Sequence, residues 1–108
     1  MTRRLEIAPE RLPPPGGRAL LHTGTHCVVL FQVDGEYHAI DDRCPHQGAS
    51  LAGGKLAGRS VQCPAHGLRF DLASGCMPQS PQVRVAVYPI HIERGRVFVC
   101  LPGEEEQT

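Results

Sequence analysis

Two short segments, each combining a cysteine, a proline, a histidine and a glycine, constrain this chain most. The first reads C-P-H-Q-G from Cys44, and the second reads C-P-A-H-G from Cys63. Thiolate and imidazole are strong metal ligands, and the proline after each cysteine restricts the loop backbone before any metal arrives. We therefore predict that two facing loops hold a metal centre through Cys44, His46, Cys63 and His66.

The spacing of these residues resembles the signature of the Rieske [2Fe–2S] proteins, in which two histidines replace two cysteines on one iron. The pattern here is C-x-H, sixteen residues, then C-x-x-H, and the segments G-L-R-F-D-L-A-S-G at 67–75 and P-Q-S-P at 78–81 extend the resemblance. The likeness spans nearly the whole chain. It implies one Rieske-type [2Fe–2S] cluster per chain, with the two cysteines on one iron and the two histidines on the other.

A structural zinc site is the alternative for the same four ligands, since zinc ribbons and fingers use cysteine and histidine at similar spacing. The prolines and glycines in both segments, together with the downstream resemblance, favour the iron–sulfur cluster. A zinc-binding structural module is therefore the remoter alternative. The colour and the iron content of the protein distinguish the two.

The remainder of the chain predicts an all-β fold. The run at 25–33 is rich in β-branched and aromatic residues, the run at 83–88 alternates polar and apolar residues, and the Asp-Gly pair at 34–35 is a hairpin signal. Many short strands with frequent turns indicate an antiparallel β-sandwich or open barrel. We expect a single Rieske-like domain over 1–108, with a cluster-binding lobe at about 43–81 inserted into the β base.

The charge and hydropathy of the chain exclude several classes of partner. The formal net charge is zero, and no basic stripe of the kind that binds nucleic acid is present. No apolar run reaches the roughly 18 residues of a membrane span, and Arg3-Arg4 precedes no apolar signal segment. We expect a cytoplasmic protein with neither a nucleic-acid nor a membrane partner.

Three of the five cysteines lie outside the motifs. Cys27 and Cys100 stand in apolar runs and are expected to be small buried side chains, whereas Cys76 lies in S-G-C-M-P, nearer the second motif. An odd and unpatterned set of cysteines fits a reducing compartment better than a disulfide scaffold. The individual roles of the three thiols are left open.

The resemblance also indicates a low reduction potential. The high-potential bc-type branch of the family has a further cysteine in each loop, and the matching residues here are Ala49 and Ala65. That branch also carries Ser and Tyr hydroxyls that favour the reduced state, and the matching residues are Leu68 and Phe70. We therefore expect a potential near the low end of the Rieske range of about −150 to +300 mV.

Two arginines lie in the wider loops 43–49 and 62–69, which contain no carboxylate. Arg43 precedes the first motif and Arg69 follows the second. A cation close to the cluster would stabilise the reduced state. Side chains that point to solvent are the alternative for both arginines.

These features predict a one-electron carrier rather than an enzyme, since no nucleophile–base pair or paired acids stand out. The resemblance implies transfer from an NAD(P)H-dependent flavoprotein reductase to a terminal oxygenase. The surface around His46 and His66 would form a small, transient contact, and the isolated protein would be a monomer. The alternative is the Rieske small subunit of an assimilatory NAD(P)H-nitrite reductase, held in a stable assembly.

Overall fold

The computed structural model describes residues 2–22, 27–43, 50–64, 67–78 and 80–102. Within these ranges every regular element is a β-strand or a short 3-10 turn, and all strand pairs are antiparallel. The prediction of an all-β, antiparallel fold is confirmed, and the strands form several open sheets rather than one closed barrel. No helix in the described ranges is long and apolar enough to cross a membrane.

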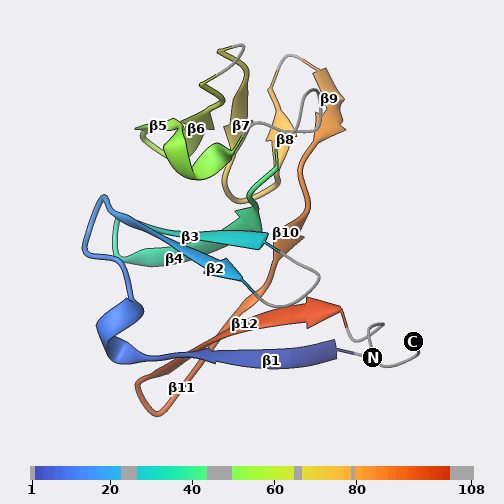
Figure 1. Cartoon of the computed structure of the whole chain (residues 1–108). Coiled ribbons are helices and arrows are strands. Elements are labelled where there is room, and N and C mark those ends of the chain that lie inside the picture. The colour runs from blue at the N-terminus through green and yellow to red at the C-terminus, as the bar shows by residue number, and fades with distance from the viewer. Residues whose placement is uncertain (1, 23–26, 44–49, 65–66, 79, 103–108) are drawn as a thin grey trace.

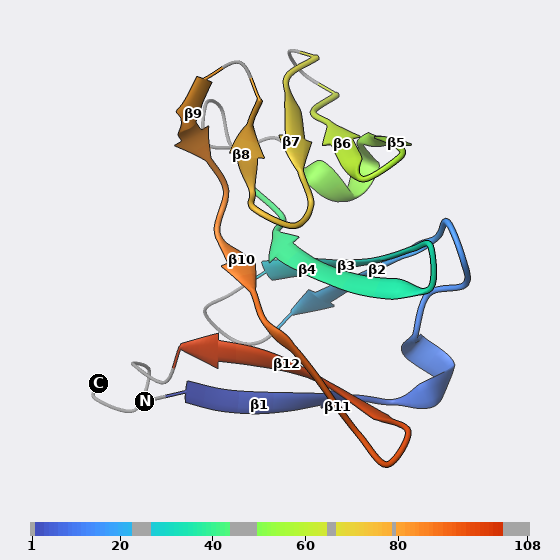
Figure 2. The ribbon, with the colours of Figure 1, turned by 180° about the vertical axis from the view of Figure 1, so that it is seen from behind.

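The strands stack in three layers, shown from two sides in Figures 1 and 2. In chain order the elements are β1 (Thr2–Ile7), η1 (Pro9–Arg11), β2 (Arg18–His22), β3 (Cys27–Val33), β4 (Glu36–Asp41), η2 (Leu51–Gly53), β5 (Lys55–Ala57), β6 (Ser60–Gln62), β7 (Arg69–Asp71), β8 (Cys76–Met77), β9 (Ser80–Arg84), β10 (Val87–Tyr88), β11 (Ile90–Glu93) and β12 (Arg96–Pro102). The lower sheet has the order β1-β12-β11, and the middle sheet has the order β10-β4-β3-β2. The upper lobe contains η2 and the sheets β5-β6-β7 and β8-β9.

The middle sheet has an apolar core on each face. Because side chains alternate along a strand, Val28 and Leu30 of β3 point to the lower sheet, while Val29 and Phe31 point to the upper lobe. The upper core consists of Val29, Phe31, Val33, Ile40, Leu51, Val61, Cys63, Phe70, Leu72 and Val85. The lower core consists of Ile7, Leu21, Val28, Leu30, Ala39, Tyr88, Val99 and Leu101. A strand buried on both faces explains why β3 reads as a nearly continuous apolar run.

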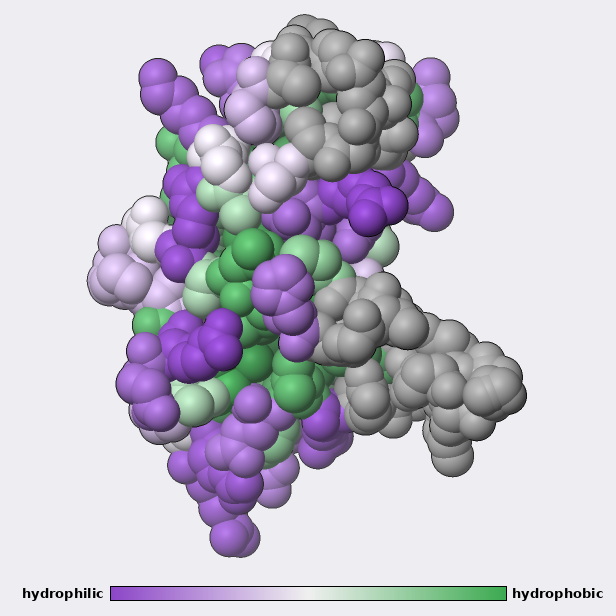
Figure 3. Space-filling model, in the orientation of Figure 1, coloured by the Kyte–Doolittle hydropathy of each residue, from purple (hydrophilic) through white to green (hydrophobic). Residues whose placement is uncertain are grey.

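The surface reflects this layering. On the face drawn in Figure 3, hydrophobic side chains gather at the centre of the molecule, and hydrophilic side chains lie above and below them. The fully buried apolar side chains of the two cores lie beneath this surface.

Two arginines connect the upper lobe to the middle sheet. Arg18 of β2 donates hydrogen bonds to the carbonyl oxygen of Ala52, at 2.9 Å, and to that of Gly54. Arg59, in the turn between β5 and β6, forms an ion pair with Glu36, at the start of β4. These contacts join the lobe to the base through β2 and through the start of β4.

The hairpin signal at 34–35 is confirmed, since Asp34 and Gly35 have φ values of 53° and 80° and connect β3 to β4. The run at 83–88, expected as one strand, is instead divided between β9 and β10. The chain passes there from the lobe to the middle sheet, because Val85 N–H donates to Gly75 and Ala86 C=O accepts from Asp41. The division into one domain, 1–108, with an inserted lobe at about 43–81, stays a prediction.

Candidate metal centre

One of the four predicted ligands, Cys63, lies in the described part of the chain. It follows β6 directly, and its side chain is 1% exposed among the apolar residues of the upper core. Cys44, His46 and His66 lie outside the described residues. The predicted ligand set therefore stays a prediction, with one member placed.

Backbone hydrogen bonds close the second motif loop between β6 and β7. The Cys63 N–H donates to the Leu68 carbonyl at 2.7 Å, and the Gly67 N–H donates to the Cys63 carbonyl at 2.9 Å. Gly67 has a φ of +73°, which favours glycine, and the Gln62 side-chain amide donates to its carbonyl at 3.1 Å. These hydrogen bonds hold the two ends of the loop, at Cys63 and Leu68, next to each other.

A buried carboxylate closes the stem of the first motif loop. Asp42, directly after β4, is 9% exposed, and its Oδ1 accepts from the Ser50 hydroxyl at 2.9 Å and from the Ala52 N–H at 2.8 Å. Its carbonyl accepts from the Leu51 N–H, and Arg43 and Ser50 form an isolated antiparallel bridge. These contacts place the residues before and after the first motif side by side.

Sequence reasoning missed Asp42. Its partners lie eight and ten residues further along the chain. No local sequence pattern predicts that the intervening loop brings them back to Asp42. The available signal was an acidic residue two positions before Cys44. A buried carboxylate is usually paired with donors, so this position could have been questioned.

The cysteines outside the motifs behave differently from the expectation of full burial. Cys27 and Cys100 are half-buried, as is Cys76, whose Sγ lies 3.7 Å from the Ser74 carbonyl. The Cys27 thiol lies 3.8 Å from Asp42 Oδ2, and burial, followed by the Asp42 charge, raises the pKa of this thiol. A thiol held in its protonated form is a weak nucleophile.

The described residues that are expected to influence the reduction potential differ in their exposure. Phe70 of β7 is fully buried in the upper core, Leu68 is half-buried, and Arg69 between them is exposed. Arg43 is exposed as well. Ala49 and Ala65 lie outside the described residues. The low potential and the effect of the two arginines on the reduced state stay predictions.

The described residues fit an iron–sulfur cluster at the motif loops. Cys63 offers a thiol that bulk water does not reach, at the fixed end of a loop, and Gly67 keeps side-chain atoms away from the turn. Among the described residues alone, no group of three or more histidine, cysteine or acidic side chains could hold a metal ion. A donor set of two cysteines and two histidines is that of a Rieske centre.

The fold, together with the predicted donor set, is that of a class of small all-β proteins in which an iron–sulfur lobe lies on a β base. Residues 6–89 match the model of the Rieske [2Fe-2S] domain, and the chain therefore belongs to this family. Its cofactor is a Rieske-type [2Fe–2S] cluster, and its role is electron transfer as a component of a larger redox system.

Curated relatives cover most of the chain. The 3-phenylpropionate/cinnamic acid dioxygenase ferredoxin subunit of Escherichia coli (strain K12) is 39% identical over 92 residues, which is 82% of this chain and 85% of the relative. The protein of the same name from Shigella boydii serotype 4 (strain Sb227) is 38% identical over 92 residues. These relatives are named as ferredoxin subunits of dioxygenase systems.

Solved structures share the fold over nearly the whole chain. The Sphingomonas yanoikuyae B1 ferredoxin has a TM-score of 0.80 and 29% identity, and the alignment covers 93% of this chain and 100% of that one. A chain in the complex of reduced oxygenase and oxidized ferredoxin in carbazole 1,9a-dioxygenase has a TM-score of 0.79 and 28% identity, covering 89% and 91%. A structure assigned as an NADH-dependent nitrite reductase small subunit from Mycobacterium tuberculosis has a TM-score of 0.83 and 26% identity, covering 95% and 98%.

Proposed function

We propose that this chain is the ferredoxin component of a dioxygenase system, which accepts one electron from an NAD(P)H-dependent flavoprotein reductase and passes it to a terminal oxygenase. The observation that carries the proposal is Cys63. Its thiol is buried at the fixed end of the C-P-A-H-G loop, in a chain whose relatives at 39% identity are named as dioxygenase ferredoxin subunits.

The ligands in this proposal are the thiolates of Cys44 and Cys63 and the imidazoles of His46 and His66. The bound cluster supplies a reversible one-electron store whose potential is raised by histidine ligation. Burial of Cys63 in the upper core keeps water from its sulfur, and the bonds that close the loop hold that sulfur in place. The chain itself performs no chemistry on the final substrate.

The partners in this proposal are a reductase and an oxygenase. In the carbazole 1,9a-dioxygenase complex an oxygenase is assembled with a ferredoxin, which supports an oxygenase as the acceptor here. We expect a small and transient contact, because a carrier must leave each partner after transfer. A monomeric state and a cytoplasmic location stay predictions of the sequence.

The nitrite reductase small subunit is the second candidate function. The observation in its favour is the TM-score of 0.83 to the structure assigned to that class. The higher identity to the curated dioxygenase ferredoxin subunits, 39% against 26%, favours the first candidate. The second candidate predicts a stable complex with a large subunit and poor solubility of this chain alone.

The test is spectroscopy of the purified protein, before and after reduction with dithionite. We expect a red-brown protein that gives a Rieske-type EPR signal only when reduced, and that loses this signal in Cys63→Ser. Colourless protein with stoichiometric zinc, after anaerobic reconstitution with iron and sulfide, would exclude the carrier. Reduction by NADH with a purified dioxygenase reductase, such as that of the E. coli system, then tests the assignment of the redox system.

A further inference from the structure

The upper lobe and its stem hold an excess of positive charge. Residues 43–84 contain five basic residues against one acidic residue, Asp71, although the formal net charge of the chain is zero. The remaining residues therefore carry the balancing negative charge. The five basic residues are Arg43, Lys55, Arg59, Arg69 and Arg84.

Two of these cations stand in one row of the lobe sheet. Lys55 of β5 pairs with Gln62 of β6, and Gln62 pairs with Arg69 of β7. Residues paired in an antiparallel sheet point to the same face. Because Val61 and Phe70 fill the upper core, this row points to the opposite, outer face. We call Lys55, Gln62 and Arg69 the basic row.

The basic row borders the second motif loop on both sides. Lys55 lines a hollow together with Cys63, Pro64 and Gly67. Arg69 lines the adjoining hollow, whose other walls are Gly67, Leu68, Met77 and Pro78. Gln62 immediately precedes Cys63 in the chain. The two cations thus lie next to the loop through which an electron would leave.

Among the described residues, no ion pair neutralises the charges of the basic row. Neither Lys55 nor Arg69 forms an ion pair or a side-chain hydrogen bond with another residue in the described ranges. Asp71, two residues after Arg69, is engaged instead with the N–H groups of Ala73 and Ser74. Both cations are therefore available to a partner.

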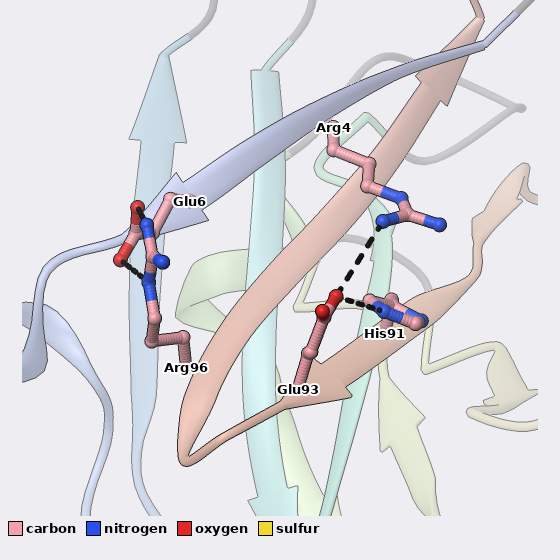
Figure 4. Close-up of polar contacts among 5 residues, drawn as sticks. All are labelled: Arg4, Glu6, His91, Glu93 and Arg96. Carbon is pink, nitrogen blue, oxygen red and sulfur yellow. Dashed lines mark hydrogen bonds and ion pairs between the residues drawn. The ribbon is translucent and has the colours of Figure 1, made fainter.

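The outer face of the lower sheet shows the opposite arrangement, drawn in Figure 4. Arg96 donates to both carboxylate oxygens of Glu6, at 2.9 and 2.7 Å. Glu93 lies 3.9 Å from Arg4 and 3.1 Å from the His91 ring nitrogen. Arg4 and Arg96 on this remote face have partners within the molecule. Lys55 and Arg69 have none among the described residues, so these two cations beside the motif loop form a candidate surface for association.

We propose that the basic row is a docking surface for acidic proteins, so that the electron-transfer partners of this chain present carboxylates to Lys55 and Arg69. The proposal rests on the carrier function proposed above and adds the sign of charge that its partners require. Complementary charge steers encounter and raises association rates by about 10- to 1,000-fold at low salt. The uncharged walls of the hollow beside Arg69, formed by Leu68, Met77 and Pro78, would border the contact.

The test uses the holoprotein, reduced with dithionite and mixed in stopped flow with two small oxidants of opposite charge. Hexacyanoferrate(III) is an anion, and tris(phenanthroline)cobalt(III) is a cation. We expect oxidation by the anion to slow as salt rises, and oxidation by the cation to accelerate. Lys55→Glu and Arg69→Glu should each slow the anion about threefold to tenfold at low salt.

Arg94→Glu is the matched control, since it makes the same change in net charge in the exposed β11–β12 turn of the lower sheet. An acidic haem protein such as cytochrome b5, used as the oxidant, tests docking of a protein as well as attraction of a small ion. Its rate of oxidation should fall with salt and in the Glu variants, as the rate with the anion does. Lys55→Gln and Arg69→Gln repeat the comparison should the charge reversals impair folding.

Equal oxidation rates in the lobe variants and the control would overturn the docking surface while the EPR signal still supported the carrier. A chain without that signal would overturn both.

Discussion

The carboxylate of Asp42 accepts a hydrogen bond from the hydroxyl of Ser50 at 2.9 Å, across the stem of the loop that carries Cys44 and His46. The same oxygen accepts the backbone N–H of Ala52 at 2.8 Å. One nearly buried oxygen therefore ties the end of the middle sheet to the start of the upper lobe.

Replacing Asp42 with alanine is expected to loosen this stem. The change leaves donors at Ser50 and Ala52 without their acceptor, at a cost of about 1–3 kcal/mol in the free energy of unfolding. Asp42→Asn retains one carbonyl oxygen and should lose less. The measurement is the loss of visible absorbance of the holoprotein on heating or in the presence of an iron chelator. Cluster loss at the wild-type rate in the alanine variant would show that the stem does not depend on this carboxylate.

The two arginines that join the lobe to the base should differ in their effect on stability. Arg18 is half-buried, donates to two carbonyl oxygens and lies 5.2 Å over the Phe31 ring, so Arg18→Ala is expected to cost about 2 kcal/mol. The side chains of Arg59 and Glu36 are 50% and 58% exposed, so Arg59→Ala should cost less than about 1 kcal/mol, and less still at high salt. Thermal unfolding of both holoproteins at low and high salt provides the comparison, and the reverse ranking would contradict it.

The pairing of Glu6 with Arg96 gives a pH dependence with a definite sign. Hydrogen bonds from Arg96 lower the pKa of Glu6 in the folded protein. The pair therefore stabilises the fold above about pH 4.3, the ordinary pKa of glutamate, and this contribution is lost as the pH falls through the lowered value. Arg96→Gln should reduce stability at pH 7 and approach wild-type stability in acid.

The Glu6 carboxyl resonance in NMR measures the same effect directly. Its titration midpoint should rise in Arg96→Gln and stay unchanged in Arg94→Gln, a control in the neighbouring turn. An unchanged midpoint in Arg96→Gln would mean that the ion pair does not persist in solution.

The residue after the second motif glycine should influence the reduction potential. Leu68 is half-buried and its carbonyl accepts from Cys63 N–H, so a hydroxyl placed there would lie near the ligand loop. Leu68→Ser is expected to raise the potential by about 20–60 mV, because a hydrogen bond contributes about 0.5–1.5 kcal/mol and 59 mV is tenfold for one electron. Protein-film voltammetry gives the value, with Leu68→Ala as the control for lost packing. An equal shift in both variants would exclude the hydroxyl as its cause.

Most of the fold could be predicted from local patterns. The apolar run of β3 and the Asp-Gly pair at 34–35 indicate a central strand and a tight hairpin, and the structure contains both. The division of 83–88 into two strands could not be predicted, because Val85 and Ala86 follow partners at Gly75 and Asp41 rather than their own alternation. Hydrogen bonds to distant parts of the chain therefore divide this run into two strands.

The sequence predicts four ligands for the candidate site, of which the structure describes Cys63, and it does not predict the residues around them. Cysteine, histidine, proline and glycine at fixed spacing announce the motif loops. Lys55, Gln62 and Arg69 lie seven residues apart in the chain, and only the register of three short strands brings them into one row. The role of Asp42 depends in the same way on a loop that returns to its starting point.

Strands β1 and β12 pair along their whole length, from Thr2 with Pro102 to Ile7 with Val97, on the side of the middle sheet opposite the upper lobe (Figures 1 and 2). A linker joined beyond either strand therefore attaches to the lower sheet. A chain tethered in this way to an electrode, or fused to a second redox enzyme, keeps its lobe turned toward the solution. The fold thus orients the upper lobe away from the point of attachment when the protein is built into an artificial electron-transfer chain.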